Sequence, residues 1–213
     1  MTKMGKEKIK TENDSVLLKG HNILLPTDNG LLKVTHYSTQ YKDQPYMSFA
    51  HLHESPEGIA EIPVLRIHSR CLFAESYGSK RCDCSEQLDE GLKSVIANKG
   101  LLIYLDQDGR GHTLGEKFHE YQLQNEEGLD TIAASQKLGL EPDARKYDVV
   151  ADILKSIGIT RVKILTNNPD KAKKLETLGI EVVEIIPSHV EANPFNREYI
   201  KRKSSFYKNE KKN

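Results

Sequence analysis

Apolar positions in the middle of the chain fall into one helix-spaced set and one continuous run. Between residues 85 and 98, Leu88, Leu92 and Val95 recur at helical spacing. The run 101–105 (LLIYL) is uniformly apolar and has the length of a strand. The pattern therefore predicts an amphipathic helix followed by a buried strand.

The same alternation continues to residue 186. Helical spacing over 149–157 precedes a strand candidate at 161–165, and a second strand candidate lies at 181–186 (EVVEII). Between the two strands, Asn168 is a good N-cap for a helix over 169–178 that starts with proline. Strand–helix–strand units with short connections predict parallel strands joined by right-handed crossovers.

The first third of the chain has a different pattern. Residues 17–50 contain alternating pieces such as 31–37, with turn signals at 27–30 (TDNG), which is typical of short antiparallel strands. A further strand is predicted at 61–67 (EIPVLRI). The predicted fold class is α/β: a layered αβα unit with a mixed or parallel sheet in the C-terminal half, preceded by a more antiparallel, β-rich N-terminal region.

Composition narrows the function classes. Lys+Arg and Asp+Glu are each 31, so the net charge is zero, which argues against nonspecific nucleic-acid binding. No apolar run approaches the roughly 20 residues of a membrane span, and the N-terminus lacks a secretory signal, so we expect a cytoplasmic protein. We predict a flexible basic arm at 1–16, a single catalytic domain at 17–200 and a basic tail at 201–213.

All three cysteines lie in one segment, as Cys71-x10-Cys82-x-Cys84. Thiolates suit Zn²⁺, and three of them leave one tetrahedral position open for water, as in a catalytic zinc site. Buried free thiols or a redox pair are the alternatives. A fourth ligand from His68 would instead make the site structural.

Four cations accompany the cysteines: Arg66, Arg70, Lys80 and Arg81. They fit either an ordinary solvated surface or an anion pocket beside a metal, and the composition does not decide between the two. Thr166 stands where a strand meets a helix N-terminus, a position that favours anions, although a simple turn residue is the alternative.

At this point the chain resembles a known family. The segments 66–71 (RIHSRC) and 78–88 (GSKRCDCSEQL) are similar to the zinc-binding signature of GTP cyclohydrolase II. Further motifs follow in the family's order, up to about Tyr199: YLDQDGRG at 104–111, Tyr121 with Gln124, GLDT at 128–131, LGLEPDARKY at 138–147 and LTNNPDK at 165–171.

The resemblance implies an enzyme that opens the imidazole ring of GTP at C8 and releases formate and pyrophosphate, the first step of riboflavin synthesis. It implies a catalytic zinc on Cys71, Cys82 and Cys84, with Tyr121 beside the reacting carbon. The residues implied to contact the nucleotide are Arg66, Arg70, Gln87, Asp108, Gly109, Arg110, Thr131, Thr166 and Lys171.

The resemblance also implies that Asp143 is a general base and Arg145 a nucleophile on the α-phosphate. Because a guanidinium is normally protonated, electrostatic stabilisation is the alternative role for Arg145, and a plain surface ion pair with Asp143 is the alternative for both. The resemblance also implies Mg²⁺ for the leaving pyrophosphate and a homodimer.

Four departures from the family lie in or next to these motifs. Asp108 replaces a Glu, Arg70 stands where Glu is common, His112-Thr113-Leu114-Gly115 replaces an apolar stretch, and Ala133-Ala134-Ser135 replaces Glu-Ala-Asn. They keep two alternatives open: a related zinc cyclohydrolase that acts on another purine nucleotide or stops at the formamide, and a non-catalytic zinc- or nucleotide-binding protein.

Overall fold

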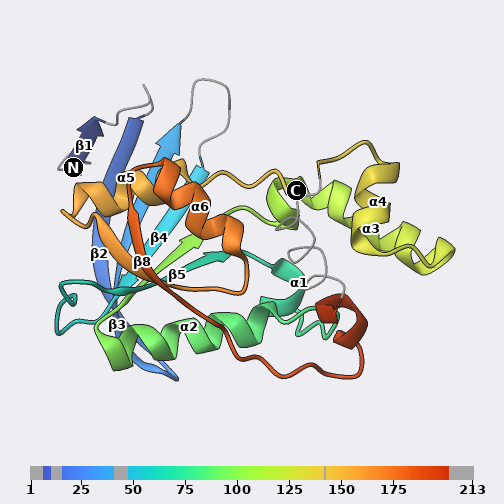
Figure 1. The fold of residues 1–213 in the computed structure, drawn as a ribbon, viewed down its shortest axis with the longest axis horizontal. Helices are drawn as coiled ribbons and strands as arrows, with labels where there is room; N and C mark the ends of the chain where they lie inside the picture. Colours follow the sequence, from blue (N-terminus) through green and yellow to red (C-terminus); the bar gives the residue numbers. More distant parts are fainter. Residues whose placement is uncertain (1–6, 11–15, 41–47, 142, 202–213) are drawn as a thin grey trace, which may run out of the picture. The chain divides into compact units, whose positions relative to one another are not determined.

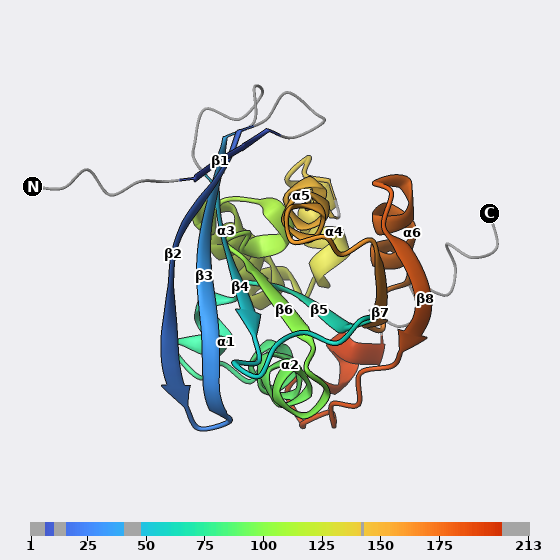
Figure 2. The ribbon, with the colours of Figure 1, turned by 90° about the vertical axis from the view of Figure 1, so that its left-hand side faces the viewer.

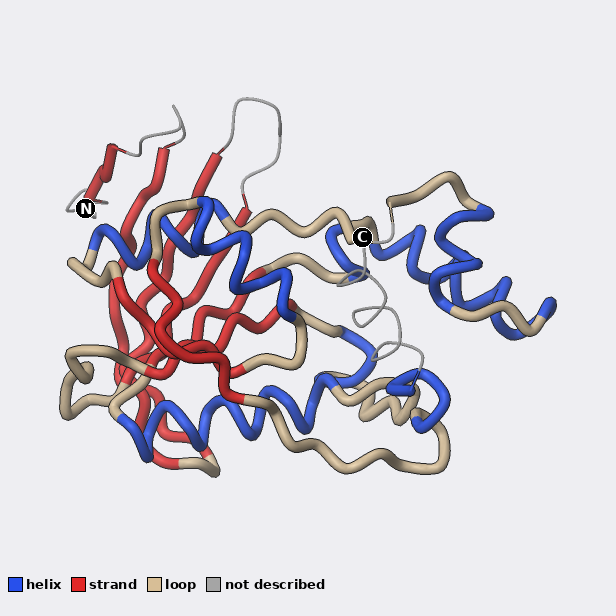
Figure 3. Tube along the Cα trace, in the orientation of Figure 1, coloured by secondary structure: helices blue, strands red, loops and turns tan. Residues whose placement is uncertain are grey.

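The structure is a computed structural model that describes residues 7–10, 16–40, 48–141 and 143–201 (Figure 1). The chain divides into two compact units. The first, here called the sheet unit, comprises 1–68, 87–106 and 147–189, and the second, here called the helical unit, comprises 69–86, 107–146 and 190–213. The sheet unit contains the strands together with some of the helices, whereas the helical unit consists of helices and loops (Figure 3).

The sheet unit contains one eight-stranded sheet in the order β1-β2-β3-β4-β6-β5-β7-β8. Its strands are β1 Glu7–Lys10, β2 Val16–Thr27, β3 Gly30–Gln40, β4 Ser48–Glu54, β5 Val64–Ser69, β6 Leu101–Leu105, β7 Arg161–Leu165 and β8 Glu181–Ile186. Strands β1 to β4 pair antiparallel, as do β4 and β6, whereas β5, β7 and β8 pair parallel. The predicted α/β fold with a mixed sheet is confirmed.

The antiparallel part of the sheet contains the hairpin of β2 and β3. The turn predicted at 27–30 connects these strands, and Gly30 has a φ of +118°, which residues other than glycine rarely adopt. Thr27 Oγ1 donates to the carbonyl of Gly30 at 2.8 Å and closes the turn. The local turn chemistry therefore sets the register of the hairpin.

Helices cover both faces of this sheet (Figure 2). Helices α5 (Asp148–Ser156) and α6 (Pro169–Thr177) pack on one face, and α2 (Cys84–Asn98) on the other. Strand β6 shows why its run is wholly apolar: Leu101, Ile103 and Leu105 join the α5–α6 core, and Leu102 joins the α2 core. The predicted buried strand is confirmed, and the structure shows that it is covered on both sides.

The sequence predicted the start of α6 correctly and the start of β5 three residues too early. Asn168 caps α6 by accepting from the backbone N–H of Asp170, with Pro169 at the first position, as predicted. The strand predicted at 61–67 is instead β5, Val64–Ser69. Pro63 has no N–H to donate to a ladder, so regular pairing starts after it.

The helical unit consists of short helices around loops. They are α1 (Leu72–Glu75), the 3₁₀ turn η1 (Gly109–Gly111), α3 (Leu114–Glu127) and α4 (Thr131–Lys137). A capping box starts α3: Thr113 Oγ1 accepts from the N–H of Glu116, whose carboxylate accepts from the N–H of Thr113. No helix within the described residues combines the length and apolarity that crossing a membrane requires.

Most residues of the predicted N-terminal arm and C-terminal tail are not among those that the structure describes. Glu7–Lys10, within the predicted arm 1–16, form the edge strand β1 on β2. Residues 1–6, 11–15 and 202–213 lie outside the described residues. The boundaries 1–16, 17–200 and 201–213 stay predictions.

The rings of His51, His53 and His68 lie near one another in the sheet unit, and we expect them to make the stability depend on pH. Burial, together with the nearby imidazoles of His51 and His68, lowers the pKa of His53 from its usual 6.5 to about 4. Within the described residues, neither ring nitrogen of His53 has a hydrogen-bond partner. Between these two pH values the unfolded chain binds the proton more tightly, so the free energy of unfolding falls as the pH falls, by up to roughly 3 kcal/mol.

We expect His53→Phe to remove this part of the pH dependence. Denaturant unfolding of the variant between pH 7 and 4 should show a shallower loss of stability than in the parent protein. His21→Gln, at an exposed position of β2, is the control and should leave the slope unchanged. Equal slopes for His53→Phe and the parent would show that the ring is protonated without cost in the folded state.

Candidate functional site

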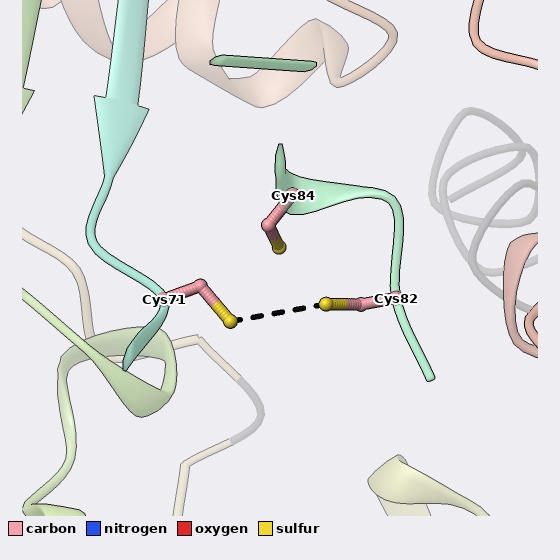
Figure 4. A group of neighbouring side chains, drawn as sticks. All are labelled: Cys71, Cys82 and Cys84. Atoms are coloured by element: carbon pink, nitrogen blue, oxygen red, sulfur yellow. Dashed lines mark hydrogen bonds between the residues drawn. The ribbon is translucent and has the colours of Figure 1, made fainter. Parts of the chain in front are cut away.

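The three cysteines converge in the helical unit (Figure 4). Cys71 precedes α1, Cys82 lies on the following loop and Cys84 is the first residue of α2. Their sulfur atoms all lie within 4.8 Å of one another, and Cys71 and Cys82 Sγ are 3.8 Å apart. In the described part of the chain this is the one group of Cys, His, Asp or Glu side chains whose ligand atoms could hold a metal, and it does not include His68.

The cluster is buried. All three cysteines are free, and Cys71 and Cys82 are almost fully buried. Hydrogen bonds from the Cys82 and Cys84 thiols, with a smaller contribution from the charge of Lys117, lower the pKa of Cys71, and the same contacts with Cys71 raise the pKa of Cys82 and of Cys84. Three soft sulfur donors at this spacing match the donor set that zinc prefers.

The C-terminal segment of the helical unit supports the cysteine loop. Asn196 is buried and donates to the carbonyl of Cys82 at 3.2 Å, and Asn193 donates to the carbonyl of Lys80 at 3.2 Å. Tyr199 packs against the cysteine cluster. The backbone around Cys82 is therefore held by side chains more than 100 residues away in sequence.

Tyr121 on α3 lies beside this centre. Its ring is 5.3 Å from that of Phe73, and the Arg81 guanidinium lies 4.9 Å from its centroid. Burial, and after it the charges of Cys82 and Cys71, raise the pKa of the Tyr121 phenol. The hydroxyl is therefore protonated at neutral pH and available as a hydrogen-bond donor.

Asp108 is the most heavily engaged carboxylate of the unit. Its Oδ1 accepts from Lys117 Nζ at 2.5 Å and from the N–H of Gly109 at 2.6 Å. Its Oδ2 accepts from the N–H of Leu72 at 2.9 Å and lies 3.8 Å from Arg70 Nε. Both oxygens thus have protein partners, and the predicted contact of Asp108 or Arg70 with a substrate stays a prediction.

Lys117 was missed by the sequence analysis. Its side chain is only 7% exposed and its Nζ lies 3.5 Å from Cys71 Sγ. Burial alone would lower the pKa of Lys117, but Asp108 and Cys71 raise it, so the ammonium stays charged. Lys117 lies four residues before Tyr121, so the two side chains share one face of α3. A helix predicted over this segment would therefore have indicated Lys117.

The predicted catalytic pair also lies in this unit. Arg145 donates from Nε to Asp143 Oδ1 at 2.8 Å and from Nη2 to Oδ2 at 2.5 Å, a two-point ion pair that is mostly buried. The pair is tied to the η1 turn because Ala144 donates its N–H to the carbonyl of Arg110 at 3.0 Å. The carboxylate therefore fixes the direction of the guanidinium plane.

Gly111 makes this close approach possible. It has a φ of +94°, and a Cβ there would lie 2.9 Å from the carbonyl carbon of Ala144. We expect Gly111→Ala to lower the free energy of unfolding by at least about 1–2 kcal/mol, because it combines a strained φ with a clash against backbone.

The matched control is Gly115→Ala in the first turn of α3. The nearest atom that a Cβ there would meet is Thr113 Oγ1 at 3.9 Å. Because alanine is the better helix former, this control should stabilise the protein by about 0.5–1 kcal/mol. Thermal and denaturant unfolding measure both changes. If Gly111→Ala does not lower the free energy of unfolding relative to the parent protein, the η1 turn accommodates the added methyl group without strain.

Thr131 is the first residue of α4. Asp130 caps this helix by accepting from the N–H of Ala133 at 2.8 Å, and the carbonyl of Thr131 accepts from Ser135 Oγ at 2.9 Å. Ser135 also donates to the buried carboxylate of Glu120 on α3. The helical unit therefore contains Tyr121, Asp108, Gly109, Arg110, Thr131, Asp143, Arg145, Arg70 and the three cysteines.

The remaining predicted residues meet in the sheet unit, where β5 and β7 end. Buried Arg66 donates to the carbonyl of Leu165 at 3.0 Å and to Gln87 Oε1 at 2.6 Å. Buried Lys171 donates to the carbonyl of Ile67 at 2.9 Å.

Thr166 follows directly after β7. Its hydroxyl accepts from the N–H of Asn168 at 3.0 Å, and its own N–H donates to the carbonyl of Ile186 at 2.8 Å. Arg66, with Gln87, is therefore linked to Leu165 at the end of β7, next to Thr166, and Lys171 is linked to Ile67 of β5. In open α/β sheets, ligands bind near the carboxyl ends of parallel strands.

Comparisons with known proteins agree with these motifs. The sequence profile of the family described as GTP cyclohydrolase II matches residues 19–187. Over 148 residues the chain is 45% identical to "GTP cyclohydrolase-2" of Shewanella sediminis (strain HAW-EB3), which covers 68% of this chain and 72% of that protein.

Longer relatives match as well. The chain is 41% identical over 184 residues to "Riboflavin biosynthesis protein RibBA" of Bacillus subtilis (strain 168), covering 85% of this chain and 45% of that protein. The protein of the same name from Parabacteroides distasonis is 38% identical over 196 residues, covering 91% and 47%. The chain thus spans about half the length of these RibBA relatives.

Proposed function

Because the chain belongs to the GTP cyclohydrolase II family, we propose that it is a GTP cyclohydrolase II-type hydrolase that opens the imidazole ring of GTP at C8. The products would be formate, pyrophosphate and a diaminopyrimidinone ribosyl phosphate, the first intermediate of riboflavin synthesis. The observation that carries the proposal is the buried group of Cys71, Cys82 and Cys84, whose sulfurs lie within 4.8 Å of one another.

The three cysteines would hold a zinc ion. Three thiolates fill three positions of a tetrahedron, which fits an open catalytic site better than a closed structural one. When bound, zinc would supply Lewis acidity and an activated water for attack at C8. The protonated Oη of Tyr121 would donate a hydrogen bond to the oxygen added at C8 and hold the proton that the opening ring requires.

The phosphates would be bound by cations and hydroxyls. Within the sheet unit, Arg66, Thr166 and Lys171 lie near the ends of β5 and β7, and Arg66 contacts the amide of Gln87, which has the donors and acceptors that a guanine edge needs. Contacts of Arg110 and Thr131 with the nucleotide are proposed from the family alone. Magnesium would neutralise the leaving pyrophosphate.

For Arg145 we propose the electrostatic role rather than the nucleophilic one. Asp143 engages the guanidinium at two points, which stabilises its charged form. A charged, oriented guanidinium can stabilise the transition state at the α-phosphate, whereas a nucleophile would have to lose its proton. The homodimer and the cytoplasmic location belong to the same proposal.

A second candidate is a related zinc cyclohydrolase that acts on another purine nucleotide or stops at the formamide. It is favoured by the engagement of Asp108, the residue that replaces the family's glutamate. Since Lys117 and two backbone N–H groups occupy both of its oxygens, Asp108 has less capacity to read a guanine edge.

The test is a product analysis. Zinc-loaded protein would be incubated with GTP and Mg²⁺, and the products followed by chromatography and mass spectrometry. Formate, pyrophosphate and the diaminopyrimidine support the main proposal, and a ring-opened product that keeps its formyl group supports the second. Unchanged GTP with zinc present, followed by no turnover of other purine nucleotides, would leave a nucleotide-binding protein without catalysis.

A further inference from the structure

Lys117 stands out among the charged residues of the helical unit because it is buried against a proposed metal ligand. Its Nζ is 2.5 Å from Asp108 Oδ1, 3.5 Å from Cys71 Sγ and 4.7 Å from the centroid of the Phe73 ring. With 7% of its side chain exposed, the ammonium has little access to water. A buried charge is stable only when its partners replace its hydration.

Asp108 holds Lys117 in this position. The same carboxylate accepts from the N–H of Leu72, the residue after Cys71, and from the N–H of Gly109. These two backbone bonds fix the carboxylate relative to both the start of α1 and the η1 turn. The ammonium is thereby fixed relative to the Cys71 sulfur rather than free to choose other partners.

The charged groups around Cys71 carry both signs. Arg70 Nε lies 3.8 Å from the Asp108 carboxylate, and Glu75 Oε1 accepts from the backbone N–H of Cys71 at 2.7 Å. Of these groups and Lys117, Lys117 is the one that lies within hydrogen-bond distance of the Cys71 sulfur itself, at 3.5 Å. Its ammonium is therefore placed to donate to a metal ligand from outside the metal's own shell.

We propose that Lys117 is a positioning residue of the metal centre, which orients the Cys71 ligand through an N–H···S hydrogen bond and is itself held in place by Asp108. The inference rests on the proposed metal site. A hydrogen bond from an ammonium withdraws electron density from the sulfur, so the metal keeps more of its Lewis acidity than three unscreened thiolates would leave it.

The experiment measures the metal centre itself. Cobalt-substituted protein gives a sulfur-to-cobalt charge-transfer band, and competition with a chromophoric chelator gives the zinc affinity. In Lys117→Met we expect the band to move to longer wavelength, because the sulfur electrons lose their stabilisation. Zinc affinity should fall by about 10- to 100-fold, the usual effect of removing an outer-shell partner.

A second variant guards against misfolding. Lys117→Met leaves buried Asp108 without its nearest cation, whereas Lys117→Met/Asp108→Asn removes both charges and is expected to fold, with the same red-shifted band. Lys137→Met is the control, because Lys137 pairs with Glu127 on the surface of the same unit and should leave band and affinity unchanged.

The outcomes are distinguishable. If the parent protein shows no sulfur-to-cobalt band, the proposed metal site and function fail. If the parent shows the band and the folded double variant keeps both its wavelength and its zinc affinity, the role of Lys117 is overturned while the proposed function stands.

Discussion

Replacing Cys82 by serine is expected to remove bound zinc and to abolish turnover of GTP. Cys82 is buried, and its sulfur lies 3.8 Å from that of Cys71. Serine keeps nearly the same volume but offers a hydroxyl that stays protonated, so one of three ligands is lost while the packing is kept. We expect turnover to fall by more than about 100-fold, beyond the usual effect of an outer-shell change.

Zinc content after dialysis and product formation from GTP measure the two effects together. The control is Ser76→Ala, at an exposed position between Cys71 and Cys82, which should change neither. The thermal stability of metal-free Cys82→Ser should match that of the metal-free parent. Retention of stoichiometric zinc with full turnover would exclude Cys82 as a ligand and with it the three-cysteine centre.

Replacing Arg145 by lysine is expected to reduce kcat by about 100- to 1000-fold while zinc content stays at the parent level. Lysine keeps the charge but loses the planar fork that donates to Asp143 at two points. An ammonium has no fixed plane, so the charge is no longer directed by Asp143. The loss should appear in kcat more than in KM if the group acts in the transition state.

The chain offers a matched control for this substitution. Arg161 on β7 also meets a carboxylate at two points, with Nε and Nη2 at 3.0 and 3.4 Å from Glu181, but this pair is exposed. Arg161→Lys should leave kcat unchanged and alter stability by less than about 1 kcal/mol. A comparably small effect of Arg145→Lys would show that the Asp143–Arg145 pair is a surface ion pair without a role in the reaction.

Sequence patterns were least informative for α3 and α4. Helix α3 buries Lys117 and Glu120, residue types that a hydrophobicity pattern assigns to the solvent face, and it exposes Phe118. Its helical period is therefore hidden in the pattern of apolar residues. The capping box of Thr113 and Glu116 is a local signal that would have marked its start.

The elements of the sheet unit, by contrast, follow from local rules. The continuous run of β6 needs burial on both faces, and Asn168 with Pro169 starts α6 wherever the helix packs. The predicted start of β5 was wrong: the strand begins after Pro63, because proline has no N–H to donate to a neighbouring strand. The order of the strands was not predictable, since pairing depends on contacts distant in sequence.

By itself, the sequence determined the chemical inventory: three clustered cysteines, an α/β pattern and motifs of one family in their family order. Only the tertiary structure decided how these groups are used. It places the three sulfur atoms within 4.8 Å of one another. It also pairs the Asp108 carboxylate with Lys117 and with two backbone N–H groups. Spacing along a chain fixes neighbours within one element, but the electrostatics of a buried site depend on which side chains other elements bring to it.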